Sequence, residues 1–160
     1  MSDETSKSTE AAESGAQAQL SVLSQYVRNL TFANTAAAEG AAPSGKPNIN
    51  VQVNVDAKPL GEDRYAVALR TDVGATADNA EVFKIALDYV GVFQLSNVPR
   101  EALQAVLLIE CPRLLFPFSR RIVAETSRDG GYPPLMLDPI DFAALYRRQL
   151  QQAAEAKADA

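Results

Sequence analysis

The clearest pattern in the chain is a strict alternation of apolar and polar residues over 48–55, where the sequence is NINVQVNV. Ile49, Val51, Val53 and Val55 fall on one side, and asparagine or glutamine occupies most of the other. A period of two is typical of a β-strand with one buried face and one hydrated face. The alternation therefore predicts a strand in this segment.

Three more segments have the strand period. Tyr26, Leu30 and Phe32 share one parity, although Arg28 interrupts the same apolar face. Two later strands are predicted where alternate positions are apolar, over 65–73 and 83–95. The last of these is apolar on its other face too, so it needs cover on both sides. We expect helices on one side and a partner subunit or partner chain on the other.

Turn residues divide the last three predicted strands. Gly61-Glu62-Asp63 and Asp78-Asn79 mark two short turns, whereas 34–47 is rich in Ala, Gly and Pro and predicts a long loop. Loops of that length inside compact domains are uncommon and often functional. Short turns between successive strands favour an antiparallel meander.

The second half of the chain predicts helices. Asn97 is placed to cap a helix that begins near Val98-Pro99. The stretch 102–126 is more apolar than one helix stripe requires. We expect Pro112 to interrupt or kink this helix and to turn the chain, and Pro117 to start a second helical piece. In that case 114–118 would anchor a connecting loop.

A last helix is predicted after an extended segment. Asp129-Gly130-Gly131 ends the preceding helix, and prolines make 132–137 extended. Asp138 is the expected cap of the final helix, which runs to Leu150. Strands followed by helices predict an α+β fold. The expected organisation is a disordered acidic tail over 1–19, one domain over 20–150 and a flexible tail over 151–160.

The composition argues against several kinds of binding partner and excludes several kinds of catalytic or metal site. The 160 residues carry a net charge of −5, no histidine and a single cysteine. An acidic chain argues against nucleic acid and anionic membranes as partners. An intramolecular disulfide, a Cys/His zinc site and a histidine-activated nucleophile all lack their residues. With no secretory leader and no apolar run near the roughly 18 residues of a membrane span, we expect a cytoplasmic protein without a cofactor.

The remaining candidate residues have simple structural explanations. Cys111 is predicted to be a small buried side chain, and Asp138 and Asp141 are predicted to be helix caps, not a catalytic pair. The aromatic residues near loops and helix starts are divided between core and a possible apolar groove for extended peptides. They are Phe32, Phe116, Phe118, Tyr132, Phe142 and Tyr146.

One long motif resembles a known family. CPRLLFPFSRRIVAETSRDGGYPPLMLDPIDFAALY resembles the signature of SecB, the bacterial protein-export chaperones: a Cys-Pro pair, Leu-Phe-Pro with an aromatic, an arginine, then Gly-aromatic-Pro and Asp-Phe. YVRNLTF and DYVGVF resemble the family's first and fourth strands. The resemblance covers about 20–150.

The resemblance implies a fold and a function. It implies a four-stranded antiparallel sheet with C-terminal helices packed on one face, and a homotetramer built as a dimer of dimers. It also implies a chaperone that holds unfolded precursor proteins without ATP, and delivers them to the SecA export motor ATPase for translocation. The family's motor-contact positions correspond to Asn29, Ala33, Lys84 and Ala86, where the family's usual acids are missing.

Candidate sites follow from this interpretation. The residues expected to bind peptide are Leu30, Phe32, Val51, Val53, Tyr132, Leu137, Phe142 and Tyr146. Those expected at the subunit interface are Ile85, Leu87, Tyr89, Leu103, Val106 and Leu107.

Two alternatives differ in function. A dedicated partner chaperone, for instance one guarding an antitoxin, would bind one dominant partner. An enzyme using Asp/Glu chemistry would need carboxylates clustered in a pocket, whereas the acids here fall mainly in tails and turns. We therefore expect a binding protein without enzymatic activity, acting on unfolded proteins and without membrane insertion.

Overall fold

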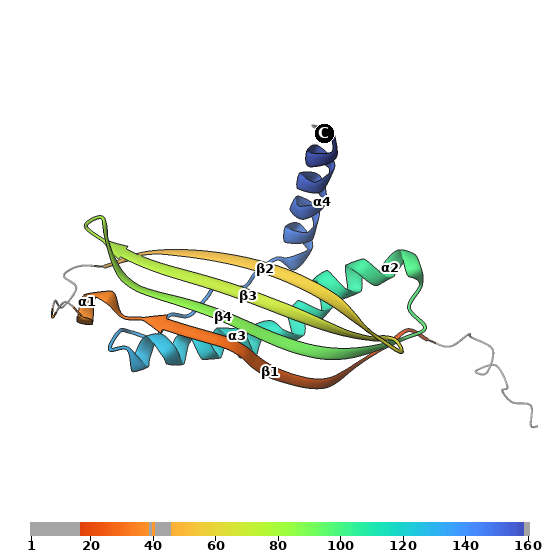
Figure 1. Cartoon of the computed structure of the whole chain (residues 1–160), viewed down its shortest axis with the longest axis horizontal. Coiled ribbons are helices and arrows are strands. Elements are labelled where there is room, and N and C mark those ends of the chain that lie inside the picture. Colours follow the sequence, from red (N-terminus) through yellow and green to blue (C-terminus); the bar gives the residue numbers. More distant parts are fainter. Residues whose placement is uncertain (1–16, 39, 41–45, 159–160) are drawn as a thin grey trace, which may run out of the picture.

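The structure is a computed structural model that describes residues 17–38, 40 and 46–158. One antiparallel sheet forms a layer, and helices cover one of its faces (Figure 1). The strands are β1 (Gln19–Ala33), β2 (Asn48–Gly61), β3 (Arg64–Ala77) and β4 (Ala80–Ser96). The helices are α1 (Thr35–Ala38), α2 (Arg100–Ala105), a π-helical turn η1 (Val106–Glu110), α3 (Cys111–Asp129) and α4 (Phe142–Ala158).

The sheet has the four antiparallel strands that the sequence predicts, but the predicted meander order is wrong for β1. β2, β3 and β4 follow one another as hairpins, but β1 pairs with β4, which gives the order β1-β4-β3-β2. The connection after β1 must therefore reach the far edge of the sheet before β2 starts. This explains why 34–47 is long, although 39 and 41–45 lie outside the described residues.

Both predicted turns are present. Gly61, Glu62 and Asp63 all have positive φ, as do Asp78 and Asn79 with φ of 53° and 64°. Two consecutive positive φ angles are typical of the tight turn that matches the twist of an antiparallel pair. The hairpins therefore form where the turn residues predict them.

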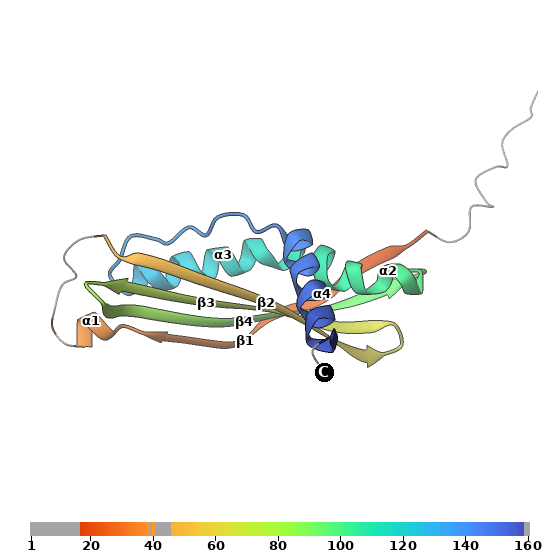
Figure 2. The same cartoon turned by 90° about the horizontal axis from the view of Figure 1, so that it is seen from above.

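The pairing register divides the sheet into two faces. Ile85, Leu87 and Phe93 point to the side where α3 packs, and we call this the covered face. Asp88, Val90 and their neighbours across the strands lie on the opposite side, the open face. Figure 2 shows α2 and α3 on one side of the sheet, which confirms the predicted layer, whereas α4 leaves it at the edge of β2.

A bulge in β1 corrects the predicted face of Tyr26. The register shifts between Val27 and Asn29, so Arg28 is an extra residue in the strand. Tyr26 pairs with Val90 on the open face, whereas Leu30 pairs with Leu87 on the covered face. Arg28 broke the apolar alternation because it occupies the bulge.

Pro112 does not interrupt the helix, and the expected turn of the chain at this position is wrong. α2, η1 and α3 form one continuous helix, Arg100–Asp129. The Cys111 N–H bonds the Val106 carbonyl five residues back, as in a π turn. The wider turn accommodates the missing N–H and the ring of Pro112 without a break. Pro117 lies inside α3, so 114–118 is helical and not a connecting loop.

This continuous helix has the length and composition of a membrane span. Its most apolar window has a mean hydropathy of 1.3, although charged residues interrupt every long apolar run. Leu107, Leu115 and Val123 are buried against the sheet. Core helices of globular proteins pass the same test of length and composition, and its packing on the sheet favours that interpretation here.

Helix ends differ in detail from the sequence prediction. Asn97 has a φ of 58° and does not cap α2, whose N-cap is Pro99. Asp141, not Asp138, caps α4, because its carboxylate accepts the Ala144 N–H at 3.0 Å. α4 continues past Leu150 to Ala158, so the expected flexible tail is largely helical. The tail expected over 1–19 lies mostly outside the described residues, and β1 already begins at Gln19.

Candidate functional site: two hollows beside β2 and the open face

The first hollow lies where the start of β2 meets the loop after α3. Its volume is about 610 Å³, and we call it the aromatic hollow. Its described lining is mostly ring and aliphatic carbon, and contains no acidic residue: Lys46, Pro47, Ile49, Phe83, Gly131, Tyr132, Pro133, Pro134 and Leu135. Such a surface fits an apolar side chain.

Backbone and side-chain hydrogen bonds at the end of α3 fix the position of the lining residues that follow it. Gly131 adopts a φ of 95°, which lets the chain leave the helix, and the Tyr132 N–H returns to the Ser127 carbonyl at 3.1 Å. The buried Ser127 hydroxyl donates to the Ala124 carbonyl at 3.0 Å and accepts the Leu135 N–H at 2.9 Å. The loop from Tyr132 to Leu135 is therefore tied to α3 at both ends.

Two lining residues of the hollow, Phe83 and Tyr132, belong to a row of three neighbouring aromatic rings. Phe32 lies 6.0 Å from Phe83, and Phe83 lies 4.7 Å from Tyr132, measured between ring centroids. Gly130 allows this packing, because a Cβ there would overlap the Phe32 ring. The row connects β1, β4 and the loop after α3 into one corner.

The second hollow lies between β2 and α4. Its volume is about 650 Å³, and we call it the β2 hollow. β2 contributes Val51 to Asn54, and the other side comprises Leu137, Asp138, Pro139, Ile140, Leu145, Arg148 and Gln152. α4 leaves the helix layer and projects beyond β2, at the edge of the sheet (Figures 1 and 2).

β2 is an edge strand that contributes lining residues to both hollows. It pairs only with β3, and Ile49 and Val51 are 39% and 38% exposed. An unpaired edge offers backbone N–H and carbonyl groups to an added strand. An extended peptide along β2 would therefore place alternate side chains toward the two hollows.

The predicted peptide-binding residues fall in different places. Val51, Val53 and Leu137 line the β2 hollow, and Tyr132 lines the aromatic hollow. Phe32 lies in the aromatic row, Leu30 lies on β1 at the other edge of the sheet, and Tyr146 is half-buried on α4. Phe142 is fully buried and packs against Phe116 in the core.

Sequence reasoning missed several lining residues. Phe83 and Ile49 lie in strands that the alternation predicted, but only the fold brings them to Tyr132. Pro133 and Pro134 also line this hollow, and they lie inside the extended segment 132–137 that the sequence associates with client binding.

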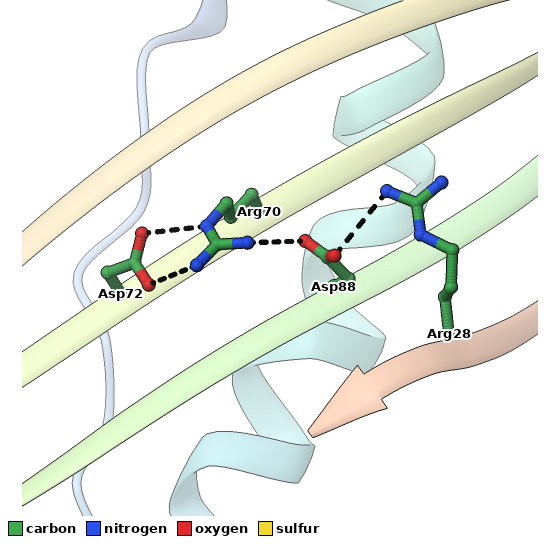
Figure 3. A network of polar contacts seen from close by, with 4 residues as sticks. All are labelled: Arg28, Arg70, Asp72 and Asp88. Carbon is green, nitrogen blue, oxygen red and sulfur yellow. Dashed lines mark hydrogen bonds and ion pairs between the residues drawn. The ribbon is translucent and has the colours of Figure 1, made fainter. Parts of the chain in front are cut away.

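The open face carries a chain of ion pairs, shown in Figure 3. Arg28 contacts Asp88 at 3.4 Å, and Arg70 contacts Asp88 at 3.6 Å and Asp72 at 3.0 Å. The hydrogen bond with Asp72, and then the charges of Asp72 and Asp88, raise the pKa of Arg70 above its ordinary value. The bulge that places Arg28 beside Asp88 thus links β1 to β4 and β3.

The four expected motor-contact positions lie around this network. Asn29 pairs with Asp88, and Ala33 pairs with Lys84, so all four residues share the open face. Ala33, Lys84 and Ala86 also line a hollow of about 490 Å³ together with Arg70 and Asp72. Asp88 is only 12% exposed in its side chain, because both arginines cover it.

Cys111 is buried, as predicted. Burial, and then the charge of Glu110, raise its pKa to about 12, so the thiol stays protonated and unreactive near neutral pH. Within the described part of the chain, no cluster of three or more His, Cys, Asp or Glu residues is placed to hold a metal ion.

The residues expected at a subunit interface mostly fill the core of this chain. Ile85, Leu87 and Leu107 are buried under the helices, as is Tyr89. Leu103 and Val106 are half-buried beside them. Other large apolar side chains remain exposed on the covered face. Ile49 and Val51 lie on β2, and five more lie on β1 and α3: Val22, Val27, Leu30, Leu114 and Phe118.

Comparison with known proteins agrees with this architecture. Residues 13–153 match the family described as preprotein translocase subunit SecB. A protein-export protein SecB of Parvibaculum lavamentivorans is 47% identical over 100% of this chain and 98% of its own length. One from Ruegeria pomeroyi is 49% identical over 94% and 96% of the two chains.

A solved structure shares the fold. A SecB-like chaperone of Mycobacterium tuberculosis, in complex with a peptide from the HigA1 antitoxin, superposes with a TM-score of 0.58 at 16% identity. It covers 76% of this chain and 87% of that one. The close relatives and the family match confirm the resemblance found in the sequence, and the chain belongs to the SecB family of protein-export chaperones.

Proposed function

We propose that this chain is a cytoplasmic, ATP-independent holdase that binds extended apolar segments of unfolded precursor proteins. The observation that carries the proposal is the free edge of β2, beside which lie the mostly apolar aromatic hollow and the mixed polar and apolar β2 hollow. Strand addition at the edge requires no particular client sequence, since it uses backbone groups. The hollows add affinity for apolar side chains, which unfolded proteins expose and folded proteins bury.

The proposed binding is non-covalent. Each large apolar side chain that enters a hollow contributes roughly 1.5–3 kcal/mol when fully buried. An enzyme using Asp/Glu chemistry receives little support, because the aromatic hollow has no acid in its described lining and the β2 hollow has only Asp138.

We infer that the chain assembles as a dimer of dimers. The exposed strip formed by Val22, Val27, Leu30, Leu114 and Phe118 supports this assembly, because each of these side chains is at least 40% exposed. Contiguous apolar surface of this kind marks an interaction site. Phe118 stacks on Tyr89, which pairs with Val27, so the strip is continuous from α3 to β1.

We propose that a SecA-type motor ATPase docks on the open face, around Asn29, Ala33, Lys84 and Ala86. These positions share the open face beside the ion-pair network. Asp72 is more exposed than Asp88, so it is the acid better placed to meet a basic segment of the motor. The docking should be weak and salt-dependent, because exposed ion pairs contribute little.

A dedicated partner chaperone is the second candidate. The observation in its favour is the shared fold with a SecB-like chaperone solved with an antitoxin peptide. The relatives at 47–50% identity, however, are protein-export proteins. Capture of many unrelated precursors supports the export role, and one dominant partner would support the alternative.

The test is aggregation of a precursor that has been unfolded in urea and diluted without ATP. We expect this chain to suppress light scattering at about one assembly per precursor molecule, and native mass to be about four times 17.2 kDa. Equal binding of the folded precursor, or no effect on the unfolded one, would contradict the proposal.

A further inference from the structure

Asn34, the residue that follows β1, makes side-chain hydrogen bonds to three residues in two segments. Its side-chain amide donates to the Gly130 carbonyl at 2.9 Å. Its side-chain oxygen accepts the Tyr132 hydroxyl at 2.5 Å and the Ala37 N–H at 3.4 Å. Gly130 and Tyr132 lie 96 and 98 residues away in the sequence.

Helix capping alone does not account for this arrangement. α1 has only four residues, and the contact to Ala37 is the longest of the three. The two shorter bonds join the end of β1 to the loop that lines the aromatic hollow. Because both groups of the amide are used, Asn34 fixes the position of Gly130 and the orientation of Tyr132 together.

The bond from Tyr132 determines what the aromatic hollow presents. The ring lies 4.7 Å from Phe83 with an interplanar angle of 40°, and its hydroxyl is already bonded to Asn34. Without this bond, a different χ1 rotamer of Tyr132 would turn its polar hydroxyl toward the hollow. With the hydroxyl held by Asn34, the exposed part of the side chain is ring carbon.

We propose that Asn34 is a positioning residue that holds Tyr132 in the geometry with which the aromatic hollow contacts aromatic side chains of a bound, extended peptide. This rests on the proposed holdase function and adds to it a residue that acts from outside the lining of the hollow. A fixed ring favours tilted or offset contact with a second aromatic ring, and these pairs depend on geometry more than aliphatic contacts do. Asn34 acts through Tyr132 and does not itself line the hollow.

The test uses the full-length chain and two fluorescently labelled, extended peptides that differ only by phenylalanine or leucine at one central position. We expect wild type to bind both and to prefer the phenylalanine peptide. Asn34→Ala should weaken binding of the phenylalanine peptide about threefold to tenfold, the effect of one neutral hydrogen bond. Binding of the leucine peptide should change less than twofold. A merely structural role would weaken both equally.

Tyr132→Phe is the second variant, because it keeps the ring and removes only the hydroxyl. It should lose the preference for the phenylalanine peptide as Asn34→Ala does. The double variant should bind that peptide no more weakly than either single variant does. Thr35→Ala is the matched control: it breaks the Thr35–Glu81 hydrogen bond of 2.6 Å at the same corner and leaves Asn34 in place. It should bind like wild type.

The outcomes separate two failures. If wild type binds both peptides and Asn34→Ala retains its preference, the role of Asn34 is overturned while the holdase function stands. Additive losses in the double variant, or equal losses for both peptides, overturn it as well. If wild type binds neither peptide, the proposed function itself fails.

Discussion

The two hollows beside β2 are similar in size but are built in different ways. The aromatic hollow lies on a corner where β1, β4 and the loop after α3 are joined by hydrogen bonds and stacked rings. The β2 hollow has an edge strand on one side and the projecting helix α4 on the other. α4 buries only Phe142 completely, so most of its length lacks core contacts.

This difference indicates that the two hollows have different tasks: the aromatic hollow is a rigid site, and the β2 hollow is an adaptable one. A fixed site can distinguish one kind of side chain from another, whereas a site beside a lightly anchored helix can accept many kinds. A holdase needs both properties, because its clients share apolar character but no sequence. Four experiments test whether the contrast is real, from the largest expected effect to the smallest.

Phe83→Ala should have the largest effect. Phe83 is 2% exposed and is the middle ring of the aromatic row, so its loss leaves a cavity in the core. We expect the free energy of unfolding to fall by about 3–5 kcal/mol. Val51→Ala, at the edge of the β2 hollow, should cost less than about 1 kcal/mol. Urea denaturation at one fixed protein concentration measures both, and equal losses would remove the contrast.

Gly130→Ala should have the next largest effect. A Cβ at this position overlaps the Phe32 ring, and overpacking of this kind costs about 1–3 kcal/mol. Gly74→Ala is the control, because a Cβ there meets no atom within 4 Å. We expect Gly130→Ala to lower the melting temperature and the affinity for the phenylalanine peptide, while Gly74→Ala changes neither. A neutral Gly130→Ala would mean that the corner is not tightly packed.

Leu150→Ser should barely alter stability. Leu150 is 47% exposed on α4, and surface substitutions usually fall within about 0.5 kcal/mol. Leu150 does not line the β2 hollow, whose α4 side comprises Leu145, Arg148 and Gln152, so the same variant should bind the leucine and phenylalanine peptides like wild type. A large loss of stability would show that α4 is packed more firmly than its burial indicates.

Cys111 offers the mildest test, because nothing is substituted. Its pKa is raised to about 12, so folding opposes the thiolate. The stabilising effect of the neutral thiol is complete below the unfolded pKa of about 9 and is lost as the pH rises toward 12. We expect iodoacetamide to label Cys111 slowly in native protein at pH 8 and rapidly in urea. Fast native labelling would show that the core around Cys111 opens in the native protein.

Local features of the sequence predicted the strands well. The alternation over 48–55 and the residues at 61–63 and 78–79 act through nearest neighbours, so the hairpins were predictable. Pairing of β1 with β4 was not, because strand order depends on contacts between distant segments. The wrong break at Pro112 has a different cause: a π turn leaves no residue pattern that distinguishes it from a helix end.

The candidate site was predictable only in part. The motif around Tyr132 and the alternation of Val51 and Val53 indicated residues that line the hollows. Phe142 has the same aromatic signal, yet it is buried in the core. The contacts of Asn34 join residues nearly a hundred positions apart, and an asparagine at the start of a loop suggests only a cap. Burial and partnership are properties of the fold, not of a residue type.

The π turn η1 has a consequence for how the long helix meets the sheet. A π turn accommodates one extra residue, and each residue turns an α-helix by about 100°. The extra residue in Val106–Glu110 therefore rotates α3 about the helix axis relative to α2. As a result, α2 and α3 turn different helix faces toward the sheet, although they belong to one continuous helix. Deleting a single residue there would restore a uniform helical phase and rotate Leu115 and Val123 away from the sheet.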